Sequence, residues 1–164
     1  MPIIARDTGS GTDFTPCPIG LHRAVCCDVV DKGMVPTEWG DKHKIQIRWQ
    51  VEEMRIEDGK PHMIFQTYNL SLHEKSKLRP ALESWRGRAF TDEELEGFDI
   101  EKLIGVNCQL QVVHNEYQNK IYANAKAIVS AAKGVEPLSV IDYDRVVDRI
   151  DGGKATEDDD VVPF

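Results

Sequence analysis

The clearest pattern in the chain is a strict alternation of apolar and polar residues over positions 44–52. Every second position is apolar, and these residues are Ile45, Ile47, Trp49 and Val51. The positions between them are polar, and these are Lys44, Gln46, Arg48 and Gln50. A period of two is typical of a strand with one buried side and one solvent-facing side. We therefore predict a strand whose outer face carries the two cations.

Four further segments, at positions 21–30, 62–70, 106–113 and 120–128, have the composition of strands. The first should end at Asp31-Lys32-Gly33, and Asp58-Gly59 is a strong hairpin signal ahead of the segment at 62–70. Loops are expected where the alternation stops and turn residues gather. These loops are positions 34–41 and 114–119.

Between the third and fourth strands the periodicity becomes helical. Leu78, Leu82 and Trp85 are spaced i, i+4 and i+7, so they should form one buried stripe. Ser76 is the expected N-cap, and Gly87 is placed to end the helix.

Two shorter helical turns should follow this helix. Thr91-Asp92-Glu93-Glu94 has the sequence of a capping box. Asp99 is placed to cap a second turn that stops before Gly105.

Three strands, a helical segment and two more strands are the element order of the oligonucleotide-binding (OB) fold, a five-stranded Greek-key barrel of the all-β class. SH3-like barrels and reduced sandwiches have similar strand numbers and stay open as alternatives. Only one core is expected, because 164 residues with 41% hydrophobic content suit a single domain. The predicted organisation is an irregular arm (1–19), the barrel (20–130), an extension with a helix or strand near 140–150 (131–151), and a mobile acidic tail (152–164).

Composition narrows the function classes. The sequence has no apolar run of about 18 residues and no signal-like start, so a cytoplasmic protein is expected. Its cysteines show no CxxC spacing and should be buried free thiols, so no metal or other cofactor is expected. They are Cys17, Cys26, Cys27 and Cys108. The usual catalytic motifs are missing, and an enzyme is not expected.

The net charge of −8 does not exclude nucleic acid as a ligand. Positions 142–164 hold eight acids and three bases, a balance of −5, so the rest of the chain carries only −3. A body that is nearly neutral can present one basic face.

Binding a single strand without sequence preference requires aromatic rings for the bases and cations for the phosphates. Trp39 is the strongest stacking candidate, because it stands alone in a polar segment, although it could instead plug one end of the barrel. Tyr68 is ambiguous, because two residue sets compete for the core face of its strand. The predicted nucleic-acid-binding residues are Trp39, Lys42, Lys44, Gln46, Arg48, Tyr68, Tyr117, Tyr122 and Lys126.

The chain ends in an acidic run followed by Val161-Val162-Pro163-Phe164. This ending resembles the C-terminal tip of bacterial and phage single-stranded DNA-binding proteins, in which an aspartate run leads to an apolar residue, Pro and a terminal Phe. Two valines stand where that pattern has one apolar residue. The resemblance implies that the tip docks onto replication, recombination and repair proteins. The implied partner-binding residues are Asp158, Asp159, Asp160, Val161, Val162, Pro163 and Phe164.

The sequence thus predicts a protein that coats single-stranded DNA in a bacterium or phage-infected cell and recruits partners through its tip. A protein–protein adaptor that binds no nucleic acid is the alternative from another class. RNA binding differs only in substrate and also stays open, as does assembly into a homo-oligomer.

Overall fold

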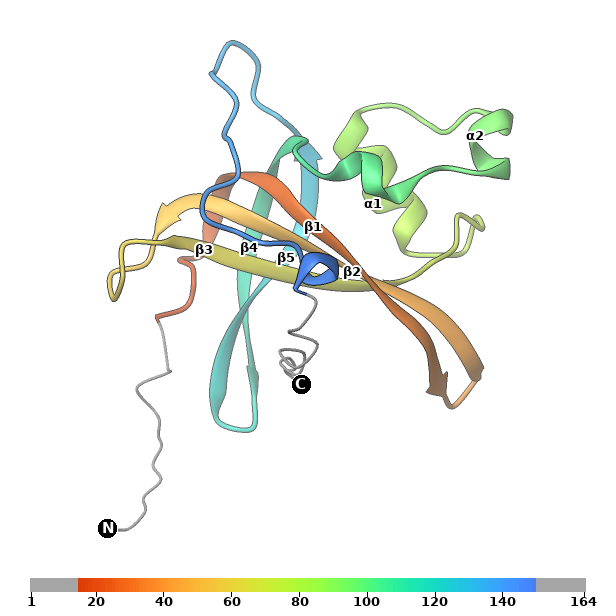
Figure 1. The fold of residues 1–164 in the computed structure, drawn as a ribbon, viewed down its shortest axis with the longest axis horizontal. Coiled ribbons are helices and arrows are strands. Elements are labelled where there is room, and N and C mark those ends of the chain that lie inside the picture. The colour runs from red at the N-terminus through yellow and green to blue at the C-terminus, as the bar shows by residue number, and fades with distance from the viewer. Residues whose placement is uncertain (1–14, 150–164) are drawn as a thin grey trace.

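The computed structural model of the chain describes residues 15–149. Five antiparallel strands form one sheet in the order β3-β2-β1-β4-β5 (Figure 1). The strands are β1 (Gly20–Thr37), β2 (Gly40–Met54), β3 (Pro61–Asn69), β4 (Asn107–Tyr117) and β5 (Lys120–Ser130). The predicted set of five strands, with a helix between the third and the fourth, is confirmed.

The helical segment lies between β3 and β4. Its longest helix is α1 (Leu78–Arg86), which ends at Gly87 in the left-handed conformation, with φ of 78°. The helix N-cap is Lys77 rather than the predicted Ser76, but the Ser76 hydroxyl still accepts a hydrogen bond from the Arg79 amide at 3.4 Å.

The two shorter turns also form as the sequence indicates. The capping box at Thr91 begins α2 (Asp92–Glu96), and the Asp99 side chain caps the 3-10 helix η2 (Ile100–Leu103). Within the part of the chain that the structure describes, every helix is too short to cross a membrane.

One hydrophobic core lies between the inner face of the sheet and α1. All four predicted apolar residues of β2 are buried in it, and Trp49 is fully inaccessible. The buried stripe of α1 completes this core through Trp85, whose ring centroid lies 5.8 Å from that of Trp49. The Trp85 indole N–H donates to the Asn107 carbonyl at 3.0 Å, which fixes the helix against the start of β4.

The prediction of a loop at 34–41 is wrong, because β1 and β2 continue through these positions as a ladder that ends at the pair Thr37–Gly40. A register shift lies between Asp31 and Gly33, and Gly33 adopts a φ of +70° there. The glycine that was expected to end the strand therefore forms a bulge, which bends the ladder without stopping it.

The expected loop at 114–119 is also wrong. β4 pairs with β5 as far as Tyr117–Lys120, so only Gln118 and Asn119 remain between the strands. Their φ angles are 52° and 65°, which is the backbone of a two-residue hairpin turn that suits the twist of the flanking strands.

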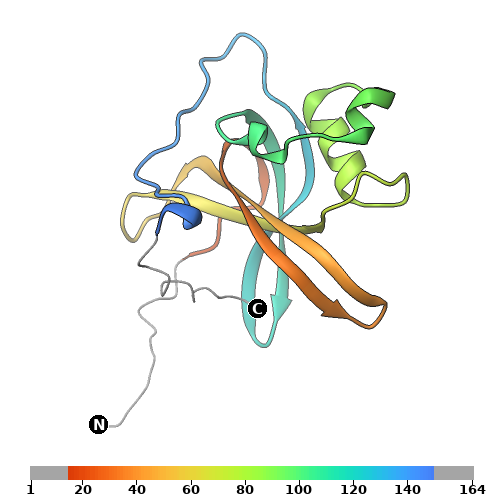
Figure 2. The ribbon, with the colours of Figure 1, turned by 45° about the vertical axis from the view of Figure 1, so that its right-hand side comes forward.

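Two hairpins consequently project from the sheet (Figures 1 and 2). β1 pairs with β4 only over Gly20–Val25, and β2 pairs with β3 only as far as Lys44–Asn69. The β1–β2 ladder therefore extends alone from the pair Met34–His43 to the pair Thr37–Gly40. The β4–β5 ladder likewise extends beyond Val112 without β1. The edge strands β3 and β5 come within 8 Å of one another between Cα atoms, but no ladder joins them in residues 15–149.

Residues 136–149, which we name the strap, cross the outer face of the sheet and are drawn in blue in Figure 1. Most of the strap has no regular structure, and it ends in the 3-10 turn η3 (Val146–Asp148). The helix or strand considered near 140–150 is therefore replaced by an irregular segment. Its backbone groups bond to side chains of the sheet, which takes the place of regular secondary structure.

Candidate nucleic-acid interface

Cross-strand pairs form a row along the outer face of β2 and β3. The strap covers one end of this row, which we call the covered end, and the other end is the open end. From the open end to the covered end the pairs are Lys44–Asn69, Gln46–Thr67, Arg48–Phe65 and Gln50–Met63. Lys42 continues the row beyond the first pair, toward the hairpin tip. Lys42 is exposed, and Lys44 and Gln46 are half-buried. The structure therefore brings these three residues together at the open end of this face, as the alternation predicts.

Arg48 lies at the covered end of this row and is 9% exposed. Its guanidinium lies 4.4 Å from the centroid of the Phe65 ring and donates to the Gln46 side chain at 2.7 Å. It also donates to the Tyr143 hydroxyl of the strap at 3.3 Å. The sequence pattern placed Arg48 on the correct face but gave no sign of the strap above it, so Arg48 is not open to a ligand in this arrangement.

Gln50 is covered in the same way and is 5% exposed. Its side-chain amide donates to the Ile141 carbonyl at 2.7 Å and accepts from the Ile141 amide at 2.8 Å. The Gln50 side chain therefore satisfies both backbone groups of Ile141, as a neighbouring strand would.

A buried carboxylate, Asp28 of β1, anchors the strap. It accepts hydrogen bonds from the Tyr143 hydroxyl at 2.7 Å, the Arg145 Nε at 3.0 Å and the Val146 amide at 2.9 Å. Arg145 also donates to Glu101 at 2.8 Å, which ties the strap to η2. The sequence did carry a signal for this anchor, because an acid within a buried run of a strand must find partners.

Trp39 lies in the turn of the β1–β2 hairpin and is 79% exposed. Its amide donates to the Thr37 hydroxyl at 3.0 Å, and that hydroxyl donates to the Gly40 carbonyl at 2.5 Å. These bonds fix the turn and leave the indole ring in solvent. The alternative in which Trp39 folds back to plug one end of a barrel is therefore wrong.

The β4–β5 hairpin carries the remaining predicted contacts except Tyr68. Tyr117 is 55% exposed at the end of β4, and Tyr122 is partly exposed opposite Asn115. Lys126 is exposed at the register shift of this ladder. These three residues are on a different hairpin from Trp39, so the predicted residues form two groups.

Tyr68 belongs to neither group. It pairs with the core residue Ile45 across β2 and β3 and packs against the core. Burial raises the pKa of its phenol to about 12. The ambiguity about its strand is thus settled in favour of Ile64 and Tyr68 on the core side, with Phe65 outward.

The cysteines are all buried and free, as the sequence indicates. Burial raises the pKa of the Cys17 thiol to about 11 and those of Cys26 and Cys27 to about 12, and it also raises the pKa of Cys108. Because the thiolate is the reactive form, we expect all four to react slowly with a disulfide reagent at about pH 8 in the native protein and rapidly in denaturant. Fast reaction of any of these thiols in the native protein would contradict their burial.

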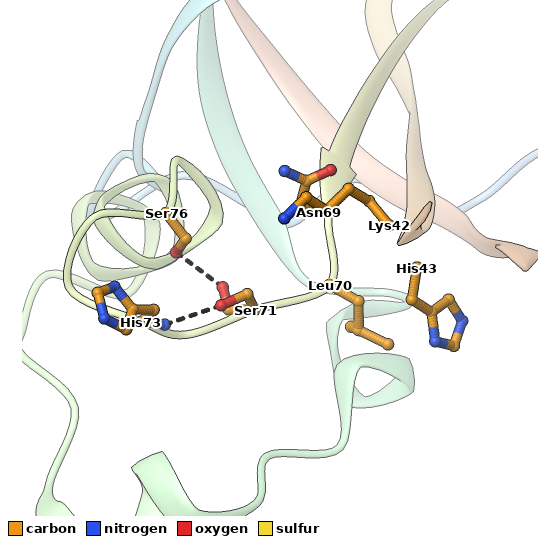
Figure 3. Close-up of a pocket in the computed structure, with 7 residues that line it drawn as sticks. All are labelled: Lys42, His43, Asn69, Leu70, Ser71, His73 and Ser76. Atoms are coloured by element: carbon orange, nitrogen blue, oxygen red, sulfur yellow. Dashed lines mark hydrogen bonds between the residues drawn. The ribbon is translucent and has the colours of Figure 1, made fainter. Parts of the chain in front are cut away.

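A polar pocket at the open end of the outer face was missed by sequence reasoning (Figure 3). It lies between the start of β2, the end of β3 and the segment that leads to α1. Its lining residues are Lys42, His43, Asn69, Leu70, Ser71, His73 and Ser76. Their spread over three segments explains why no local motif revealed them.

Residues 158–164, the implied partner-binding tip, lie outside the described residues. Within residues 15–149, no group of three or more His, Cys, Asp or Glu side chains is arranged to hold a metal ion.

No protein-family model matches this chain, and no curated protein matches its sequence.

Proposed function

We propose that the chain is an OB-fold protein that binds single-stranded DNA largely without sequence preference. The observation that carries the proposal is the β1–β2 hairpin, which presents the solvent-exposed Trp39 ring next to the open row of Lys42, Lys44 and Gln46. A large exposed ring in a fixed turn is available to a ligand, and nucleic-acid bases suit it because every base has a π-face.

The strand order supports the OB assignment. In that fold the outer face of strands two and three, with the loops between strands one and two and strands four and five, forms the binding surface. Here the corresponding elements are the β2–β3 face and the two projecting hairpins. The approach of β3 to β5 suits a barrel whose last seam is not joined by a ladder.

The proposed DNA path follows the open part of the β2–β3 face. Bases would stack on Trp39 at one hairpin and on Tyr117 or Tyr122 at the other, while Lys42, Lys44 and Lys126 contact phosphates. The covered end of the face stays occupied by the strap. Glu38 and Asp41 also lie near the hairpin tip, so the cationic row begins at Lys42.

The acidic tip would recruit replication, recombination or repair proteins. This part of the proposal rests on the sequence of residues 158–164 alone and on its resemblance to the tip of single-stranded DNA-binding proteins. Phe164 would supply the aromatic anchor, and the acids would steer it toward a basic pocket.

A fluorescence titration with a thymidine oligonucleotide tests the binding proposal. Three phosphate contacts give a slope of log affinity against log salt of about −2, so affinity should fall about 20-fold between about 50 and about 200 mM salt. A matched uridine oligonucleotide distinguishes DNA from RNA preference. No binding to either strand at low salt would reject the proposal and favour a protein–protein adaptor.

A further inference from the structure

The pocket at the open end of the outer face has a volume of about 300 Å³ and is lined by groups that donate hydrogen bonds (Figure 3). One cation, two imidazoles, two hydroxyls and one amide belong to its lining, and its described lining residues include no carboxylate. Such a composition favours a ligand that only accepts hydrogen bonds.

Internal hydrogen bonds determine which of these groups are left for a ligand. The Lys75 amide donates to Nδ1 of His73 at 3.0 Å, so the hydrogen of a neutral ring lies on Nε2, which is left to donate. The Ser71 hydroxyl accepts from the His73 amide at 3.1 Å and keeps its own hydrogen. The Ser76 hydroxyl, in contrast, is occupied because it donates to the Ser71 carbonyl at 2.7 Å.

Two further donors complete the set. The side chains of Lys42 and Asn69 both line the pocket, and neither has a hydrogen-bond partner among residues 15–149. The third charged or ionisable lining residue, His43, is already bonded to Asp31 at 2.7 Å. Lys42, Asn69, Ser71 and His73 are therefore the groups available to an incoming anion.

We propose that this pocket holds a phosphate group of the bound DNA strand. The inference rests on the proposed function and deepens it. Asn69 is the cross-strand partner of Lys44, so a strand that follows the open row reaches the pocket without a change of direction. A phosphate accepts from several donors at once, and Lys42 supplies the countercharge. Leu70, which is 38% exposed, offers an apolar surface to the adjoining sugar.

Asn69→Asp tests the proposal, because it places a carboxylate in the pocket with almost no change in shape. Asn69 is exposed and its side chain bonds nothing that the structure describes, so the fold should tolerate the change. Affinity for a thymidine oligonucleotide should fall about tenfold or more, because two anions would face each other in one pocket. The matched control is Ser139→Asp, an equal charge change at an exposed position of the strap, which covers the other end of the face, and it should change affinity less than about threefold.

A direct readout of the pocket is the NMR signal of the Asn69 side-chain amide in the unmodified chain. It should shift on addition of the oligonucleotide, and inorganic phosphate at millimolar concentration should compete for the same shift. Equal losses in Asn69→Asp and Ser139→Asp would overturn the proposal while leaving DNA binding intact. A shift with inorganic phosphate alone, with equal losses in the two variants, would also overturn it, because the pocket would then take free phosphate. Failure of the unmodified chain to bind DNA would instead reject the proposed function.

Discussion

Replacement of Asp28 with alanine is expected to lower the free energy of unfolding by about 3 kcal/mol. The carboxylate is 1% exposed as a side chain and receives three hydrogen bonds from the strap. Two of these donors are neutral and one is charged, so their loss weakens the attachment of residues 143–146 to β1 and leaves the bond from Arg145 to the Val29 carbonyl at 3.3 Å. The cost lies at the low end for a broken buried ion pair, because a released strap can be rehydrated.

Urea unfolding measures this effect, and a thermal melt should show a decrease of about 6–12 °C for a domain of this size. Hydrogen exchange gives a local readout, since the Leu138 and Ile141 amides donate to Asn107 and Gln50 side chains only while the strap is in place. Both amides should exchange faster in the Asp28→Ala variant.

Asp144→Asn is the matched control, because Asp144 belongs to the same strap but its side chain is exposed. A surface change of this kind should alter stability by less than about 0.5 kcal/mol. Equal stability of Asp28→Ala and the unmodified chain would contradict the anchoring role of Asp28. Slow exchange of Ile141 in that variant would contradict it as well.

The position of the strap could not be predicted from the sequence. Its attachments join residues far apart in the chain, such as Gln50 with Ile141 and Asp28 with Arg145. Neither helical nor strand periodicity marks such a segment, because its backbone is satisfied by side chains of the sheet. The alternation in β2 correctly predicted which residues face outward, but it could not distinguish an open outer face from a covered one.

Patterns that involve residues close in the sequence predicted the structure better than they predicted the long-range contacts of the strap. The i, i+4, i+7 stripe, the capping box at Thr91 and the alternation of β2 each involve contacts within a few residues, and all three formed as predicted. Apart from the N-cap of α1, the local patterns fail at the two hairpins, where turn residues predict loops but the strands continue. Gly33 and Asn119 have positive φ angles, but one forms a bulge and the other a two-residue turn, so both hairpins are longer than expected.

Trp39→Ala is expected to raise the dissociation constant for a thymidine oligonucleotide about tenfold or more. Stacking of one base on an aromatic ring contributes about 1–3 kcal/mol, and about 1.4 kcal/mol corresponds to a factor of ten. Stability should change little, because the indole is 79% exposed and only the backbone of Trp39 takes part in the turn. The matched control is Ile56→Ala, since Ile56 is 86% exposed in the turn between β2 and β3.

The three tryptophans allow this prediction to be separated from a general loss of affinity. Trp49 and Trp85 are 0% and 3% exposed, so Trp39 is the tryptophan that a bound base can reach. Trp39→Phe keeps an aromatic ring and should retain most of the affinity, yet the quenching of tryptophan fluorescence by DNA should largely disappear. Fluorescence anisotropy of a labelled oligonucleotide measures the affinity independently of the protein's own emission. Full quenching in Trp39→Phe would mean that the core tryptophans report the binding, and unchanged affinity in Trp39→Ala would remove Trp39 from the DNA path.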